Sequence, residues 1–381
     1  MKDEKKSVTF FSRRVLLKTL GLSVAGAITG CTPNKPLLMS VSRHLRLARV
    51  RVSPDRVIRT VVGLRPYRAS GFVVRADRFD EKTVVHNYGH GGGGITLSWG
   101  SAHLAAELAG RTGHRQAAVL GCGALGLATA RLLQRQGWMA TIYARDLPPQ
   151  TTSNIAGAQW SPTSVFDPGK TSAEFDEQFL QAMRLSYRYF QDMVGDRYGV
   201  RWVSNYILHD KSAPPGGLVG QHPEMYPETL LLGPGEHPFP TPYALHYYTM
   251  FIEPAVYLNA VLRDFLEAGG KIMVRELKSR EDVLALTEPL VVNCTGLGAY
   301  NLFGDKELTP IKGQLTVLLP QHDVDYLLIH QGFYMFPRRD GILLGGTFDQ
   351  GNWNLEPDLE AEHRILDAHA DVFRRMTLPT L

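Results

Sequence analysis

The stretch "QAAVLGCGALGLATARLLQRQGWMATIYARDLP", residues Gln116 to Pro148, decides the fold. Its apolar pattern predicts a short strand at 117–120, a helix at 127–135 and a second strand at 139–144. The turn between the first strand and the helix carries three glycines in the G-x-G-x-x-G spacing, Gly121, Gly123 and Gly126. Such glycines permit a tight turn and let a pyrophosphate approach the N-terminus of the helix. Inside a strand–helix–strand unit, this spacing predicts a Rossmann-like α/β domain that binds a dinucleotide.

The end of the second predicted strand offers a partner for a ribose. An acidic residue often binds the ribose hydroxyls at this place, and Asp146 stands there with Arg145 before it. We expect Asp146 to bind the ribose and Arg145 to lie near the adenosine phosphate. The alternative is that the two residues form a solvent-exposed pair. The glycine motif alone does not distinguish NAD from FAD.

Two further segments point to the cofactor. In "TTSNIAGAQWSP", residues 151–162, the hydroxyls of Thr151, Thr152 and Ser153 can bind phosphate or ribitol oxygens. The small residues at 155–158 would let the backbone pass close to a flat ring, and Trp160 then opens an apolar block. "VVNCTG", residues 291–296, is an apolar strand that ends in Thr-Gly.

These three segments, in this order, resemble the D-amino-acid oxidase family of FAD enzymes. Three later segments, 246–279, 311–318 and 332–353, resemble the family's substrate domain, so the resemblance covers roughly Pro54 to the C-terminus. It implies FAD as the cofactor. It places the flavin contacts at Gly91, Gly94, Ile95, Thr96, Gly121, Cys122, Gly123, Ala124, Leu125, Gly126, Arg145, Asp146, Thr151, Thr152, Ser153, Ala158, Gln159, Trp160, Leu277, Thr295 and Gly296.

The order of the segments differs from that of the family. "GLRPYR" (63–68) and "HNYGHGGGG" (86–94) resemble segments that end a family member, yet here they precede the first dinucleotide strand. The C-terminal "EHRILDAHADVFRRMTLPTL" resembles the helix that normally runs into the first of them. We therefore predict a circular permutation, cut before Arg59 and rejoined through 109–116, because chain ends often lie close together. The alternative is an unrelated glycine-rich turn.

The resemblance also assigns the substrate site. It implies that Arg65 binds a carboxylate through two parallel hydrogen bonds, that Tyr334 supports the same carboxylate, and that the Gly92 carbonyl accepts from the substrate amine. The alternatives are a surface ion pair for Arg65 and a packed strand aromatic for Tyr334. The family's second tyrosine has no counterpart in the short "IHQGF" connection, where His330 could stand at the mouth of the site.

The implied reaction is the oxidation of a D-amino acid by hydride transfer to flavin N5, with a 2-oxo acid, ammonia and hydrogen peroxide as products. Positioning and electrostatics suffice for it, so no acid–base pair is required. Dioxygen or a quinone would reoxidise the flavin. The alternatives are a glycine or secondary-amine oxidase, a quinone-linked D-amino-acid dehydrogenase and, in another class, a non-catalytic flavin-binding protein of the cell envelope.

The excess positive charge is confined to the N-terminus. Met1–Cys31 contains six of the 41 Lys and Arg and two of the 37 Asp and Glu, so the other residues carry 35 of each sign. This balance gives no reason to expect a nucleic-acid partner. Arg13 and Arg14 before an apolar run resemble a twin-arginine export signal, and "ITGC" at Cys31 resembles a lipobox. We expect an exported lipoprotein anchored to the membrane at Cys31, with a single anchor helix as the alternative.

These observations divide the chain into four parts. Residues 1–31 are the predicted signal, and 32–56 a tether. Residues 57–160 and 268–300 form a discontinuous FAD-binding domain, and 161–267 with 301–381 a mixed-sheet α+β substrate domain. His86 and His90 have no Cys or acidic companions in the sequence, so we expect no metal. The oligomeric state stays open between a monomer and a homodimer.

Overall fold

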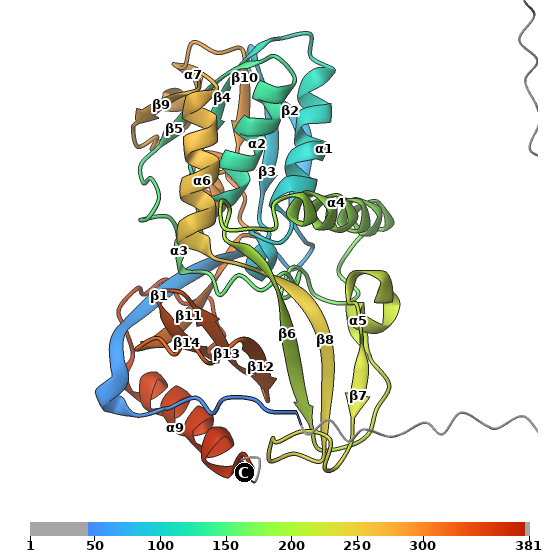
Figure 1. Ribbon diagram of the computed structural model, residues 1–381. Helices are drawn as coiled ribbons and strands as arrows, with labels where there is room; N and C mark the ends of the chain where they lie inside the picture. Colours follow the sequence, from blue (N-terminus) through green and yellow to red (C-terminus); the bar gives the residue numbers. More distant parts are fainter. Residues whose placement is uncertain (1–44, 378–381) are drawn as a thin grey trace, which may run out of the picture. The chain divides into compact units, whose positions relative to one another are not determined.

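Two β-sheets form the core of the part of the chain that the computed structural model describes, residues 45–377 (Figure 1). The predicted signal, with Arg13, Arg14 and Cys31, lies outside the described residues, as do residues 32–44 of the predicted tether. Within 45–377, no helix is both long and apolar enough to cross a membrane.

The first sheet, here called the cofactor sheet, has six strands in the order β2-β3-β10-β4-β5-β9. Five run parallel, and β2 pairs antiparallel with β3 at one edge. Parallel strands buried on both faces are apolar throughout, which explains the unbroken "LVV" of β10. The bounds are β2 (Val73–Phe79), β3 (Lys82–Tyr88), β4 (Gln116–Leu120), β5 (Met139–Ala144), β9 (Lys271–Val274) and β10 (Leu290–Asn293).

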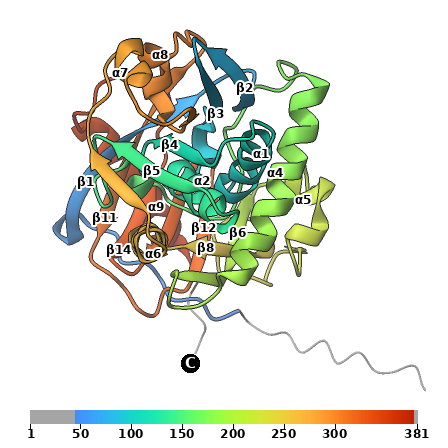
Figure 2. The ribbon, with the colours of Figure 1, turned by 90° about the horizontal axis from the view of Figure 1, so that it is seen from above.

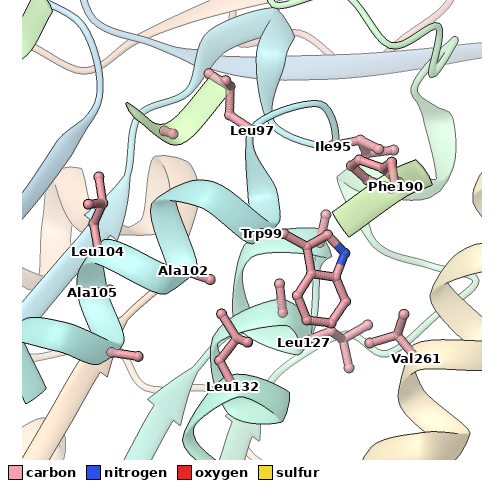
Figure 3. Close-up of a cluster of buried hydrophobic side chains, with 14 of the residues drawn as sticks. Ile95, Leu97, Trp99, Ala102, Leu104, Ala105, Leu127, Leu132, Phe190 and Val261 are labelled. Carbon is pink, nitrogen blue, oxygen red and sulfur yellow. The ribbon is translucent and has the colours of Figure 1, made fainter. Parts of the chain in front are cut away.

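Helices cover both faces of the cofactor sheet. On one face α1 packs on α2, α2 on α6, and α4 on the outside of α1; the short α7 and α8 pack on the other (Figures 1 and 2). Trp99 of α1 is buried among Leu127 and Leu132 of α2, Val261 of α6 and Phe190 of α4 (Figure 3). The helices are α1 (Ser98–Gly110), α2 (Ala124–Arg135), α4 (Ala173–Asp192), α6 (Pro254–Glu267), α7 (Arg280–Leu284) and α8 (Ala299–Leu302).

The second sheet, here called the substrate sheet, has nine strands in the order β1-β11-β14-β13-β12-β6-β8-β7, with β15 beside β11. Only β12 and β6 pair in parallel. One face packs on α9 (Leu359–Arg375) through residues such as Tyr326, Met335 and Phe373. The strands are β1 (Val57–Tyr67), β6 (Val200–His209), β7 (Leu230–Leu232), β8 (Tyr243–Ile252), β11 (Thr309–Leu318), β12 (Tyr326–His330), β13 (Phe333–Arg338), β14 (Gly341–Gly345) and β15 (Asp349–Gln350).

The sheets correct the predicted domain bounds in two places. β1, assigned to the FAD-binding domain, pairs with β11 along its length and belongs to the substrate sheet. The helices α4 and α6, assigned to the substrate domain, pack on the cofactor side, because their apolar faces are buried against α1 and α2. The remaining short helices are η1 (Pro54–Arg56), η2 (Gly91–Gly93), α3 (Thr152–Ile155), α5 (Gly217–Gln221), η3 (Pro223–Met225) and η4 (Gly296–Gly298).

Residues 45–56, the described end of the predicted tether, are packed against the substrate sheet. Val50 is 2% exposed in the cluster beneath α9. The Tyr326 hydroxyl donates to the Ala48 carbonyl over 2.8 Å, and the Arg49 guanidinium donates to the Met376 carbonyl. The segment therefore runs from the end of α9 to the start of β1 as part of the domain, and residues 45–56 do not form a free tether.

Candidate active site

The glycine loop between β4 and α2 has the geometry of a phosphate-binding turn. Gly121 has a φ of +104°, and a side-chain carbon there would lie 2.7 Å from the Cys294 carbonyl oxygen. A side-chain carbon at Gly126 would lie 2.0 Å from the Gly121 carbonyl oxygen. Gly123 is the N-cap residue of α2. Only glycine fits at positions 121 and 126, and the tight turn leaves the positive end of α2 facing an anion.

Ser153 of the "TTS" segment lies at that helix end. The Ala124 N–H donates to the Ser153 hydroxyl over 3.0 Å. Thr151 precedes α3, and its hydroxyl donates to the Asn154 side-chain oxygen over 2.8 Å. The Ser153 hydroxyl therefore stands beside the N-terminus of α2, where phosphate oxygens would bind.

Asp146, the predicted ribose partner, follows β5 and lies beside Arg145. The Arg145 guanidinium lies 2.7 Å from the Asp146 carboxylate and 3.5 Å from that of Glu276, and its side chain is 67% exposed. The two side chains form an exposed ion pair, and the binding of a ribose by Asp146 stays a prediction. Leu277 is half-buried and packs against the apolar cluster that contains Leu120 and Val291.

The end of β10 meets the end of β3. Thr295 donates its hydroxyl to the Asn293 side-chain oxygen over 2.7 Å, and the Asn293 amide lies 3.1 Å from His86 Nδ1. Burial lowers the pKa of His86 to about 4, although the neighbouring Asp77 opposes this shift. A neutral His86 accepts the amide hydrogen bond and so fixes Asn293, which in turn holds Thr295 and the Gly296 turn in place.

The loop before α1 is pressed against the chain after Trp160. A side-chain carbon at Gly92 would lie 2.6 Å from the Thr163 carbonyl oxygen, and the Gly92 N–H donates to the Ser164 carbonyl over 3.0 Å. Thr96 donates to the Ser161 carbonyl over 3.2 Å. Two predicted cofactor segments therefore lie together. They hold the predicted contacts Gly91, Gly94, Ile95, Thr96, Ala158, Gln159 and Trp160.

His90 in this loop is a packing residue. Its ring stacks on Phe72 at 4.4 Å, and burial lowers its pKa to about 3. In the described part of the chain, no three His, Cys, Asp or Glu side chains are grouped as metal ligands would be.

Arg65 of β1 and Tyr334 of β13 come together on the face of the substrate sheet opposite α9. The Arg65 guanidinium donates to the Tyr334 hydroxyl over 3.4 Å, and its Nη1 is buried without a hydrogen-bond partner in the described residues. Burial raises the pKa of Tyr334, with Arg65 acting against the shift, so the phenol stays protonated. Tyr334 also stacks on Phe336 at 4.9 Å.

Two glycines that the sequence analysis did not single out make room for this pair. A side-chain carbon at Gly313 would lie 2.3 Å from Arg65 Nη1, and one at Gly345 would lie 2.1 Å from Tyr334 Cζ. Gly313 stands inside β11 and Gly345 ends β14, and glycine in a strand commonly marks a close approach. The glycines in the strand segments "KGQ" and "LGG" were therefore a signal in the sequence for this close approach.

A third missed residue is Arg338, which ties the cofactor segment to the substrate sheet. Its guanidinium is held by both oxygens of Asp340, over 2.8 and 2.9 Å, and donates to the carbonyls of Asn154 and Ala156. The "PRRDG" turn contains it, but nothing in the sequence indicates its distant partners.

His330 does not stand beside Tyr334. It lines a cavity of about 130 Å³ with Phe333, His369 and Asp371, between the β12–β13 turn and α9. Side chains alternate along a strand, so His330 points away from its neighbour Ile329, which packs with Tyr334.

The residues fit a flavin dinucleotide. The glycine cradle and the N-terminus of α2 suit a pyrophosphate, and the segments around Gly92 and Gln159 lie beyond it. A family model described as FAD dependent oxidoreductase matches residues 26–108 and 116–380. The chain belongs to this family. It is an FAD enzyme, and the glycine loop with the "TTS" segment would hold the cofactor's phosphates.

The similarity to individual proteins is consistent with this family. The oxidoreductase is 30% identical over 261 residues to a D-amino-acid oxidase of Rubrobacter xylanophilus, covering 66% of this chain and 75% of the relative. Glycine oxidase from Geobacillus kaustophilus has a TM-score of 0.51 at 15% identity, covering 70% of this chain and 81% of that one. L-alpha-glycerophosphate oxidase from Mycoplasma pneumoniae with FAD bound gives 0.51 at 15% identity, covering 69% and 79%. The two structures show a shared fold.

Proposed function

We propose that this oxidoreductase oxidises D-amino acids to 2-oxo acids and ammonia and passes the electrons to dioxygen, which yields hydrogen peroxide. The observation that carries the proposal is the buried Arg65 Nη1, which has no partner in the described residues and lies beside the Tyr334 hydroxyl. A buried guanidinium N–H without a partner is costly, and a ligand carboxylate would complete its hydrogen bonds. The name of the Rubrobacter relative supports the choice of substrate.

The chain's residues would bind and orient the substrate. The planar guanidinium of Arg65 can bind an α-carboxylate through two parallel hydrogen bonds, and the protonated Tyr334 can donate a third. The Gly92 carbonyl would accept from the amine, which fixes the remaining direction at the α-carbon. The bound flavin supplies the acceptor for the hydrogen and the electron pair that the α-carbon loses. No side-chain base is needed if the amine binds neutral, so positioning carries the rate.

A peroxide assay tests the proposal. The purified flavin-loaded protein is offered a panel of D-amino acids, their L-enantiomers, glycine and sarcosine. Peroxide from D-amino acids only is the expected result. Turnover of glycine and sarcosine alone would favour the glycine or secondary-amine oxidase instead. Turnover only with a quinone analogue in place of dioxygen would favour the dehydrogenase, and no turnover with any acceptor would favour a non-catalytic flavoprotein.

We also propose that the chain is circularly permuted. Residues 109–115, between the two matched segments, belong to the predicted junction. The turn after α1 leads directly into β4, whose neighbour β10 also pairs with β3. At the other end, residues 49–56 lead from Met376 to the start of β1, the path a direct link after α9 would take.

The cellular location is a separate proposal, because it rests on residues outside 45–377. We propose export by the twin-arginine route and a lipid anchor at Cys31. Arg13→Lys with Arg14→Lys should retain the protein inside the cell, and Cys31→Ala should release it from the membrane fraction. Unimpaired export of the double variant would reject the route. Gel filtration of the released protein would decide between a monomer and a homodimer.

A further inference from the structure

Three buried polar side chains lie on the Arg65 side of the substrate sheet. Gln159, Asn205 and Tyr247 are 9%, 0% and 2% exposed. Neither polar atom of the Asn205 amide has a hydrogen-bond partner in the described residues, and Gln159 Nε2 has none either. Buried amides are nearly always paired in folded proteins, because an unpaired one is destabilising. The retained polar groups therefore call for a ligand.

The strand register shows where the polar group lies. Asn205 stands between Tyr247 of β8 and Leu327 of β12. Leu327 packs in one cluster with Phe336 and Tyr334 of β13. Strands are about 4.8 Å apart, so Asn205 lies about two strand spacings from Phe336. Asn205 and Tyr247 therefore lie on the strands beyond the stacked rings of Tyr334 and Phe336. With Gln159 they form what is here called the polar layer.

Gln159 brings the cofactor segment to this layer. Its backbone forms a bridge with Phe251 of β8, and its side chain approaches the Tyr247 hydroxyl, where it opposes the rise in the Tyr247 pKa that burial causes. Phe251 packs on Phe336 at 5.9 Å. Gly157 leaves space for Phe336, since a side-chain carbon there would lie 2.7 Å from the ring. Neighbouring contacts thus connect Arg65 to Gln159 through Tyr334, Phe336 and Phe251.

The charges near Gln159 restrict the kind of substrate side chain that can lie beside it. Arg201 lies over the Phe251 ring at 4.7 Å, but it is bound by the Glu253 carboxylate and donates to the Pro337 carbonyl over 2.7 Å. Its charge is already balanced, so a second ligand carboxylate would be buried without a partner. An apolar side chain would leave the Gln159 amide unpaired. An uncharged polar side chain satisfies both conditions.

We propose that the substrate pocket selects D-amino acids whose side chains end in a carboxamide or hydroxyl group. The proposal rests on the proposed D-amino-acid oxidation at the same site. Gln159 is the residue that contacts the substrate side chain, although the sequence placed it with the cofactor segment. Tyr247 and Asn205 are positioning residues behind it, which keep the end of the pocket polar.

Steady-state kinetics of the flavin-loaded enzyme test the proposal with D-glutamine, D-methionine and D-glutamate, which have similar lengths. We expect kcat/KM for D-glutamine to exceed kcat/KM for D-methionine and for D-glutamate by about tenfold or more. The free energy of one hydrogen bond corresponds to a factor of roughly that size. Gln159→Leu should reduce the D-glutamine to D-methionine ratio about tenfold, mainly through KM. Gln136→Leu, at the exposed end of α2, is the matched control and should leave the ratio unchanged.

A second measurement does not depend on turnover. Asn205→Leu keeps the size of the side chain and removes two unpaired buried polar atoms, so its melting temperature should rise above that of the parent. A fall would mean that Asn205 has a structural partner, and it would overturn the polar layer. Asn259→Leu, exposed on α6, controls for the substitution itself.

The outcomes separate this inference from the proposed function. A parent enzyme that prefers D-methionine or D-glutamate, or a Gln159→Leu variant with an unchanged ratio, overturns the inference and leaves D-amino-acid oxidation in place. A flavin-loaded parent that oxidises no D-amino acid overturns the proposed function, and the inference with it.

Discussion

The two sheets build their sites in different ways. At the cofactor sheet, six consecutive residues, Gly121–Gly126, supply the turn that faces the dinucleotide. At the substrate sheet, the central pair Arg65 and Tyr334 are 269 positions apart in the chain. One site is local in sequence, and the other exists only after the chain has folded.

The strand directions explain the difference. Parallel strands end at the same edge of a sheet, so the loops after β3, β4 and β10 meet there whatever their order in the chain. The substrate sheet is mostly antiparallel, and its functional side chains stand within strands. Long side chains can lie there only where neighbouring strands provide space, and Gly313 and Gly345 do so.

The largest effect is expected at the glycine loop of the cofactor sheet. In Gly126→Ala the new carbon would lie 2.0 Å from the Gly121 carbonyl oxygen, and backbone atoms of this tight loop cannot yield. The purified variant should be colourless and inactive, as judged by its flavin absorbance. Gly110→Ala is the control, because nothing lies within 4 Å of the added carbon. A yellow Gly126→Ala protein would show that the loop is not the cofactor cradle.

The next largest effect is expected at Arg65, and it tests the site of the substrate sheet alone. Arg65→Ala should lower kcat/KM for D-amino acids about a hundredfold or more, because losing a charged partner in a closed site costs on the order of 2–5 kcal/mol. Arg65→Lys should fall between, since lysine lacks the planar two-point contact. The flavin content should not change, and L-amino acids should stay poor substrates. Near-normal turnover by Arg65→Ala would place the carboxylate elsewhere.

A third effect appears where the two sheets meet, since His90 after β3 forms a bridge with Tyr67 of β1. Burial lowers the pKa of His90 to about 3, against about 6.5 in the unfolded chain. The unfolded state therefore binds more protons between these values, so the stability is complete above about pH 6.5 and is lost as the pH falls. The loss should reach about 2 kcal/mol at pH 5.

His90→Phe should flatten this dependence, because it keeps the stacking on Phe72 and removes the titrating group. Urea unfolding at pH 7 and pH 5 measures it. His86, whose pKa is also lowered, will leave a remainder of the same sign. An unchanged difference between the two pH values would mean that His90 does not control acid stability.

A smaller effect is expected at Gly313, and it tests whether this glycine makes room for Arg65 in the substrate sheet. In Gly313→Ala the added carbon would lie 2.3 Å from Arg65 Nη1, the end of a flexible side chain that can move aside. The displaced guanidinium should raise KM and lower kcat/KM about tenfold, with the flavin content intact. Gly233→Ala, whose added carbon would have its nearest neighbour at 3.5 Å, should behave as the parent. Equal kinetics for the two variants would remove Gly313 from the site.

The smallest effect concerns the order of the segments. A chain that begins at Arg115, runs to Met376 and continues through a short linker into residues 49–110 should bind flavin and keep kcat/KM within about twofold. The Arg49 contact to Met376 shows that the new junction is short, and closing short loops costs little. An insoluble or colourless product would show that the present order is required for folding.

The segments predicted to bind the cofactor lie close together in the fold, because each follows a buried parallel strand or joins one. Ser153 of the "TTS" segment lies beside the glycine loop, and the loop before α1 lies against the chain after Trp160. Their contacts with the flavin stay predictions. Asp146 forms an exposed ion pair with Arg145, and its contact with the ribose stays a prediction. His330 was associated with the substrate site because it is near Tyr334 in the chain, but strand alternation turns it toward α9.

By itself, the sequence determined the Rossmann-like α/β class and FAD as the cofactor, and it supplied the predicted flavin segments and the two residues proposed to bind a carboxylate, because short motifs carry the geometry of turns and helix ends. Tertiary structure alone decided that β1 joins the substrate sheet, that Gly313 and Gly345 make room for Arg65 and Tyr334, and that Asn205 and Tyr247 stand near Gln159. Strand register sets those contacts, and the register follows from packing across the whole sheet, which no local pattern encodes.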